Sequence, residues 1–122
     1  MRVIIAGGRY FDDYDLLKKK VDSILKKSTN IEIISGMATG ADSLGLNYAK
    51  EKGYKTIEMP ANWDKYGKSA GYRRNEDMAS IADACIIFWD GESKGTKHMI
   101  DLAKQYNLQL RIIKYKKWRL KI

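Results

Sequence analysis

The spacing of apolar residues changes its period repeatedly along the chain. Short continuous apolar runs predict strands that are buried on both faces, at residues 2–6, 31–34, 55–59, 84–89 and 109–115. Between these runs, apolar residues recur at helical spacing. This second pattern predicts helices from the acids at 12–15 to the lysines at 26–27, and at 41–52, 71–82 and 96–106. The polar and aromatic segment 61–71 is expected to be a loop.

Strands and helices that alternate in this way predict an α/β fold with a parallel sheet, because right-handed crossovers place helices on both faces of such a sheet. A length of 122 residues fits a single domain over residues 1–122. We predict a mainly parallel sheet of five strands in the order 3-2-1-4-5. Ligands of such sheets bind beyond the carboxyl ends of the strands where the order reverses, here between the first and fourth strands.

Most of the glycines gather in the segments that open at this edge. The segments are residues 7–9, 35–42, 60–75 and 90–96. The three short ones hold six of the ten glycines, and the longer one adds Gly67 and Gly71. Turns with only a structural purpose have no reason to collect glycines at one edge, so we expect a binding crevice there.

The first two segments favour close approach of a ligand to the backbone. Gly7 and Gly8 end the first strand, and glycine leaves room for such an approach. The following Arg9 either contacts a phosphate or pairs with a nearby aspartate. Ser35 stands where a dinucleotide-binding strand carries an acid, and the G-x-G-x-x-G spacing is absent, which disfavours a nicotinamide dehydrogenase. Asp42, where a helix begins, either caps that helix or holds a ribose hydroxyl.

The segment DGESKGT, residues 90–96, leads into a helix and is typical of an anion site. Free backbone N–H groups at a helix start lie at the positive end of the helix dipole. The alternative is that Ser93 or Thr96 only caps its own helix. The adjacent Lys94 favours a phosphate. His98, in the first turn, is expected to face solvent.

In GYRRNEDM, arginines stand at a helix start, where cations are unfavourable unless an anion is near. Arg74 shares a helix face with Met78, so we expect its guanidinium to reach the crevice, whereas Arg73 points elsewhere. We expect no metal, because the acids at 12–15 open a helix and one cysteine with one histidine cannot form a zinc site. Cys85, in the apolar run ACIIF, is interpreted as a buried inert thiol.

Composition adds a location and one further kind of partner. An apolar content of 44% is enough for a core, and no run has the length of a signal peptide or a membrane span. We therefore expect a soluble cytoplasmic protein without membrane insertion. Much of the net charge of +8 lies in a basic C-terminal end, residues 114–122. This end is either solvated or a patch for phosphate backbones or acidic membrane, with Tyr115 and Trp118 placed to stack on bases.

Four motifs follow one another between about Arg2 and Ile113: AGGRYFDD, SGMATGAD, MPANWDKYGKSAGYRRNEDM and FWDGESKGTKHMI. Together they resemble the YspA-like branch of the SLOG superfamily, which includes DNA-processing protein A and the LOG phosphoribohydrolases. The resemblance implies a Rossmann-like three-layer α/β/α fold and a nucleotide-type ligand such as ADP-ribose or an NAD-like molecule, with no separate cofactor. It also implies a homo-oligomer, a dimer or larger.

The resemblance also implies roles for individual residues. SGMATGAD matches the pattern of the DNA-processing relatives at Ser35, Gly36, Ala38, Gly40 and Asp42. The arginine of the phosphoribohydrolase arginine-lysine-x-x-methionine motif aligns with Arg74. The glycine and threonine of that family's phosphate-binding loop align with Gly95 and Thr96.

The catalytic glutamate of the phosphoribohydrolases is replaced here by Met99. Methionine cannot stabilise an oxocarbenium-like ribosyl centre or activate water, so we rank ligand binding first. Cleavage of an N-glycosidic bond is second, with Arg74, Asp42 or Glu92 as candidate catalytic residues. Binding of single-stranded nucleic acid through the basic end is third. The candidate ligand-binding residues are Gly7, Gly8, Arg9, Ser35, Gly36, Gly40, Asp42, Arg74, Asn75, Asp90, Ser93, Lys94, Gly95 and Thr96.

Overall fold

The structure is a computed structural model that describes residues 1–116. Expectations for Trp118 and for the rest of the basic end beyond Lys116 lie outside the described residues. The strands are β1 (Arg2–Gly7), β2 (Glu32–Ser35), β3 (Lys55–Glu58), β4 (Ala84–Trp89) and β5 (Gln109–Lys114). The helices are α1 (Tyr14–Ile24), α2 (Ala41–Lys52), α3 (Trp63–Tyr66), α4 (Ala70–Ile81) and α5 (Lys94–Gln105), with a 3₁₀ turn, η1 (Gly67–Ser69).

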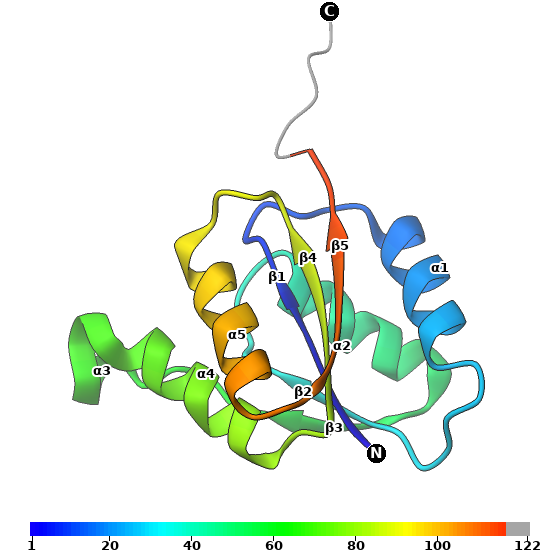
Figure 1. Ribbon diagram of the computed structural model, residues 1–122, viewed down its shortest axis with the longest axis horizontal. Coiled ribbons are helices and arrows are strands. Elements are labelled where there is room, and N and C mark those ends of the chain that lie inside the picture. Colours follow the sequence, from blue (N-terminus) through cyan, green and yellow to red (C-terminus); the bar gives the residue numbers. More distant parts are fainter. Residues whose placement is uncertain (117–122) are drawn as a thin grey trace, which may run out of the picture.

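The sheet is parallel throughout, and its five strands lie in the order β3-β2-β1-β4-β5, as predicted. Helices α1 and α2 cover one face, and α4 and α5 cover the other, in a Rossmann-like α/β arrangement (Figure 1). Alternate residues of β1 divide between the two cores: Val3 and Ile5 face α1 and α2, whereas Ile4 faces α4 and α5. The central strand is therefore apolar at successive positions, because both of its faces are buried.

The segment 61–71, expected to be a loop, contains α3 and η1 and the start of α4. Asn62 caps α3, and its Oδ1 accepts a hydrogen bond from Lys65 N at 3.1 Å. The helix α3 is four residues long and buries none of them. A helix this short has no apolar period, so the sequence pattern could not distinguish it from a loop.

Two helix ends also differ from the prediction. The helix α1 begins after Asp13, whose carboxylate accepts from Leu16 N at 3.0 Å, and it ends at Ile24. The lysines at 26–27 therefore lie in the turn that follows the helix. The helix α5 begins at Lys94, which is earlier than the expected start at Thr96. The bounds of α2 and β4 agree with the prediction, and Gly53 ends α2 in the left-handed conformation.

Close backbone contacts hold the loops behind the carboxyl edge of the sheet. Gly8 N donates to Phe88 O at 3.0 Å, and Ala41 N donates to Gly8 O at 3.1 Å. A Cβ at Gly7 would stand 2.2 Å from Phe88 O. A Cβ at Gly40, where φ is 79°, would stand 2.2 Å from Gly8 O. Both glycines are needed because backbone, and not a movable side chain, occupies the space.

Among residues 1–116 no helix is long and apolar enough to cross a membrane. The same residues contain no cluster of three or more side chains that could hold a metal ion. Burial raises the pKa of the Cys85 thiol to about 12, which leaves it protonated and unreactive at neutral pH.

Candidate functional site

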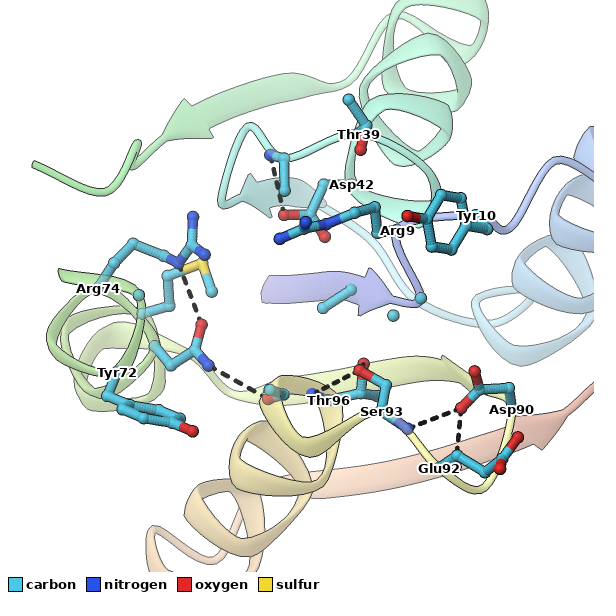
Figure 2. Close-up of a pocket in the computed structure, with 18 of the residues that line it drawn as sticks. Arg9, Tyr10, Thr39, Asp42, Tyr72, Arg74, Asp90, Glu92, Ser93 and Thr96 are labelled. Atoms are coloured by element: carbon cyan, nitrogen blue, oxygen red, sulfur yellow. Dashed lines mark hydrogen bonds between the residues drawn. The ribbon is translucent and has the colours of Figure 1, made fainter. Parts of the chain in front are cut away.

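A cavity of about 500 Å³ opens at the carboxyl ends of the strands, where the strand order reverses between β1 and β4. Side chains from α2, α4, α5 and the loops after β1 and β4 enter it (Figure 2). The residues that line it are Ala6, Gly7, Gly8, Arg9, Tyr10, Ala38, Thr39, Asp42, Trp63, Lys68, Gly71, Tyr72, Arg74, Asn75, Met78, Asp90, Glu92, Ser93, Gly95, Thr96 and Tyr115.

Most of the predicted site residues meet in this cavity. Those that line it are Gly7, Gly8, Arg9, Asp42, Arg74, Asn75, Asp90, Glu92, Ser93, Gly95 and Thr96. Four others, Ser35, Gly36, Gly40 and Lys94, are not part of its lining. Lys94 instead borders a neighbouring hollow of about 430 Å³, together with Trp89, Lys97 and His98.

Ser35 and Gly36 act behind the cavity wall. The Ser35 hydroxyl is fully buried, donates to Asp42 O at 3.3 Å and accepts from Met37 N at 3.1 Å, so it closes the turn after β2. A Cβ on Gly36 would stand 2.6 Å from Arg74 Nη1 and 2.8 Å from Asp42 Oδ2. The missing side chain of Gly36 therefore leaves the space in which the guanidinium and the carboxylate come together.

Asp42 is a buried carboxyl on the cavity wall and not a helix cap. Gly40 occupies the N-cap of α2, and Asp42 Oδ2 accepts from Ala38 N at 3.2 Å in the preceding loop. Only 5% of Asp42 is exposed. Burial raises the pKa of Asp42 to about 6, although the Ala38 hydrogen bond and the charge of Arg74 both act to lower it.

Arg74 reaches from α4 to the loop after β2. Its Nη1 donates to Gly36 O, and its Nε donates to Asn75 Oδ1 at 3.0 Å. Burial lowers the pKa of Arg74, and the charge of Asp42 opposes that shift. The neighbouring Arg73 points away, as predicted: its guanidinium lies 4.5 Å from the centre of the Tyr66 ring.

The loop after β4 is held so that α5 points its N-terminus at the cavity. Asp90 Oδ1 accepts from the backbone N–H groups of Glu92 and Ser93, each at 2.8 Å. Ser93 caps α5, and its Oγ accepts from Thr96 N at 3.4 Å and from Thr96 Oγ1 at 3.0 Å (Figure 2). The first N–H to bond within the helix is that of Lys97, to Ser93 O at 3.0 Å. The N–H of Gly95 precedes it at the positive end of the helix dipole.

Aromatic rings at the rim were missing from the predicted set of ligand-binding residues. Tyr10 is 73% exposed, Trp63 58% and Tyr72 48%, and all three line the cavity. Tyr115, which follows β5, lines it as well. Trp63 and Tyr72 fall within the segment 60–75 that the sequence assigned to this edge, so the topology was the signal that pointed to them. Trp63 lies on α3, which the sequence pattern did not predict, and Tyr72 lies on α4.

His98 was expected to face solvent, and the structure finds it partly buried. Its ring meets the Tyr72 ring edge-on, with the ring centres 4.4 Å apart. Its Nδ1 lies 3.3 Å from Asn75 Nδ2. Burial lowers the pKa of His98, against the opposing charges of Asp101 and Glu76.

Comparisons with known proteins show the family of the chain. The family described as "YspA, cpYpsA-related SLOG family" matches residues 1–66. The Gene 61 protein of Mycobacterium phage D29 is 32% identical over 114 residues, which cover 85% of this chain and 89% of that protein. The chain belongs to the YspA-related SLOG family.

A solved structure resembles the fold of this SLOG protein. It is DNA processing protein A from Helicobacter pylori, described by its single-stranded DNA binding mode, with a TM-score of 0.65 and 20% sequence identity. The match covers 92% of this chain and 64% of that one, so the SLOG chain spans less than two thirds of the other's length. At this identity the likeness establishes the fold.

Met99, which stands where the resemblance to the phosphoribohydrolases places their catalytic glutamate, faces the core of this SLOG protein. Met99 is 1% exposed and packs on α5 against Ile4 and Ile87 of the sheet, and it is not part of the cavity lining. A carboxylate for chemistry at the cavity would therefore have to come from another element. Asp42 on α2 and Asp90 and Glu92 after β4 are the acids that line it among the described residues.

Proposed function

We propose that this SLOG protein binds a nucleotide or a nucleotide-derived ligand, of the ADP-ribose or NAD-like kind, in the cavity between β1 and β4. The observation that carries this proposal is the meeting of three kinds of group around one space. A guanidinium and a helix N-terminus suit an anion, a buried carboxyl suits a hydroxyl, and exposed rings suit a planar base.

The positions of these groups divide the cavity into three parts. The phosphate would lie between Arg74 and the N–H groups at the start of α5, near Gly95 and Thr96. A ribose hydroxyl would donate to Asp42, whose carboxylate is anchored by Ala38 N. The base would lie at the rim, against Tyr72 or Trp63. A volume of about 500 Å³ falls within the range of about 300–1,000 Å³ that small-molecule sites occupy.

Calorimetric titration with AMP, ADP-ribose and NAD tests the proposal, with Arg74→Ala and its neighbour Arg73→Ala as a matched pair. Both variants remove a guanidinium from α4, but only Arg74 lines the cavity. We expect at least one ligand to bind and Arg74→Ala to weaken it by about tenfold or more, the effect of a lost charge-assisted hydrogen bond. Equal effects of the two variants, or no binding by any of the three ligands, would reject the proposal.

Asp42 supports a second candidate, hydrolysis of the N-glycosidic bond. With a pKa of about 6, this carboxyl is mainly ionised at neutral pH and can accept a proton from water. The water oxygen would bond to the anomeric carbon while its proton passes to Asp42, and the carbon–nitrogen bond would break. The base would leave with the electron pair and would take the proton from Asp42. Chromatography that detects free base with the native chain, and none with Asp42→Asn, would support hydrolysis. Intact nucleotide after prolonged incubation would leave binding alone.

The basic end supports a third candidate, the binding of single-stranded nucleic acid. The net charge is +8, and the similar solved structure is a protein described by its single-stranded DNA binding mode. In the described part of this end, Lys114 Nζ lies over the Trp89 ring at 5.5 Å, beside the cavity loops. A labelled oligonucleotide that binds this protein and is released by salt would favour this role.

A further inference from the structure

The Asn75 side chain joins Arg74 to the start of α5. Asn75 is 8% exposed and lies on α4, which packs beside α5. Its Oδ1 accepts from Arg74 Nε at 3.0 Å. Its Nδ2 lies 3.4 Å from Gly95 O and 3.3 Å from His98 Nδ1. One amide therefore contacts a cavity cation, the helix N-terminus and an imidazole ring.

Two of these partners fix which way the amide faces. A guanidinium N–H only donates hydrogen bonds, and a backbone carbonyl only accepts them. With the amide reversed, Nδ2 would face Arg74 Nε and Oδ1 would face Gly95 O, so both contacts would become repulsive. The observed orientation is thus set by groups that do not change protonation near neutral pH. The third contact follows from it: Nδ2 donates, so His98 Nδ1 must accept, and the ring is neutral with its proton on Nε2.

The two acids whose charges act on His98 form hydrogen bonds with other groups. On α5, Asp101 accepts from Lys97 Nζ at 2.6 Å, and on α4, Glu76 accepts from the Tyr106 hydroxyl at 3.4 Å. The remaining charged or titratable groups that border the hollow with His98 are Glu92, Lys94 and Tyr72. Both Asp101 and Glu76 favour a proton on His98 through their charge, whereas burial disfavours it.

We propose that Asn75 is a positioning residue that holds Arg74 at the cavity and couples its position to the protonation state of His98. A second proton on the ring would sit on Nδ1 and point at the Asn75 N–H. The amide would then have to leave His98 or turn, and turning would remove the acceptor from Arg74 Nε. For ligand binding the inference rests on the proposed function: a ligand held by Arg74 and a proton on His98 would oppose one another.

The first test uses the protein without a ligand. His98 is the only histidine in the chain, so its ring resonances can be assigned directly. NMR of the native protein would follow the His98 ring and the Arg74 Nε–H resonance between about pH 5 and about pH 8, the range in which histidine titrates. We expect the Arg74 resonance to move with the midpoint of His98. The Nε–H of Arg73, which donates to Ser69 Oγ at 3.1 Å, is the internal control and should not follow it.

The variant His98→Asn separates this coupling from Asp42, which has a pKa of about 6 and also titrates in this range. Its Oδ1 can take the place of Nδ1 as an acceptor, but it does not titrate. The part of the Arg74 titration that belongs to His98 should disappear, while the Asp42 part remains. Superimposable Arg74 profiles for the native protein and His98→Asn would overturn the inference.

A second variant, Asn75→Asp, tests the direction of the hydrogen bond. A carboxylate beside Nδ1 can only accept, so the proton of the ring should move to Nδ1 and the pKa of His98 should rise above that of the native protein. The nitrogen chemical shifts of the ring report this change. The exposed Asn47→Asp on α2 is the matched control. Unchanged nitrogen shifts in Asn75→Asp would also overturn the inference.

The third test uses ADP-ribose, whose diphosphate does not change charge in this pH range. Its affinity should fall with decreasing pH by about fivefold more in the native protein than in His98→Asn, a typical size for coupling between two sites. The same pH dependence in both proteins would overturn the inference. If ADP-ribose binds at no pH, that result counts against the proposed function, and the NMR experiments still decide the coupling.

Discussion

At the scale of single residues, the ionised carboxylate of Asp42 should lower stability at the position where we propose that it binds a ribose hydroxyl. Its pKa is raised from 3.8 to about 6, so the folded protein holds this proton more tightly than the unfolded chain does. The stability that Asp42 contributes should therefore be fully present below about pH 4 and be lost as the pH rises through about 6. The total loss is about 3 kcal/mol, from about 1.4 kcal/mol for each pKa unit.

Replacing Asp42 by asparagine should remove this cost, because the amide keeps an acceptor for Ala38 N but carries no charge. We expect Asp42→Asn to be more stable than the native protein by up to about 3 kcal/mol at pH 7.5, with the difference vanishing near pH 4. Urea unfolding at the two pH values measures it. The same variant should bind a nucleotide less well. A variant that is less stable at both pH values and binds the nucleotide as tightly as the native protein would mean that Asp42 has only a structural role.

The sequence alone could not show which residues of the SGMATGAD motif line the cavity and which support it from behind. The pattern SGMATGAD indicated Ser35, Gly36 and Asp42 as ligand-binding residues, yet of these three only Asp42 lines the cavity. The Gly36 carbonyl accepts a hydrogen bond from the Arg74 side chain, 38 residues along the chain, whereas the Ser35 hydroxyl closes a local turn by accepting from Met37 N. A local sequence pattern predicts at which edge of the sheet a residue lies, but it does not predict whether the residue lines the cavity or supports its wall.

At the scale of elements, the sequence predicted the five strands and the four longer helices, and it missed the short helix α3 and the turn η1. The strand β4 and the helix α2 have the predicted bounds because their ends coincide with changes of pattern or a glycine cap. The helix α3 depends on one capping residue, Asn62, and on contact with α4, since Trp63 lies 3.5 Å from where a Cβ of Gly71 would stand. Tertiary contacts of this kind leave no periodic signal.

The N-cap of α5, formed by Ser93, should contribute to the stability of the fold. Ser93→Ala removes the acceptor of Thr96 N, so we expect a loss of about 1 kcal/mol in the free energy of unfolding, the usual cost of an N-cap. Urea unfolding with an unchanged m-value measures it. Asn62→Ala, which removes the cap of the short exposed helix α3, is the control and should cost less than about 0.5 kcal/mol. Equal losses would show that Ser93 does not support α5 through its cap.

At the scale of the whole molecule, topology accounts for most of what could be predicted about the site. The strand order 3-2-1-4-5 brings the segments after β1, β2 and β4 to one edge, and the cavity opens there. Eleven predicted residues consequently line one space although they are spread from Gly7 to Thr96. The ring contacts at the rim and the contacts of the Asn75 amide with Arg74, Gly95 and His98 were not predictable, because they depend on how α3, α4 and α5 pack together.

The cavity and the basic end should differ in how strongly salt weakens ligand binding, because their charges are distributed differently. An oligonucleotide held by the basic end releases counterions from each phosphate that is neutralised. With four such phosphates, raising salt from about 50 to about 200 mM should weaken binding by about 50-fold. A nucleotide held by Arg74 in the cavity should lose far less. Fluorescence anisotropy with a labelled oligonucleotide and calorimetry with ADP-ribose, in the same two buffers, compare the two sites.

The matched variants assign each response to its residues. Replacing Lys117, Arg119 and Lys121 by serine should flatten the salt dependence of the oligonucleotide and leave ADP-ribose unaffected. Arg74→Ala should weaken the binding of ADP-ribose and leave the binding of the oligonucleotide and its salt dependence unaffected. If Arg74→Ala weakens both ligands equally, the cavity and the basic end hold a single ligand, and the terminal nucleotide of a strand would then occupy the space between β1 and β4.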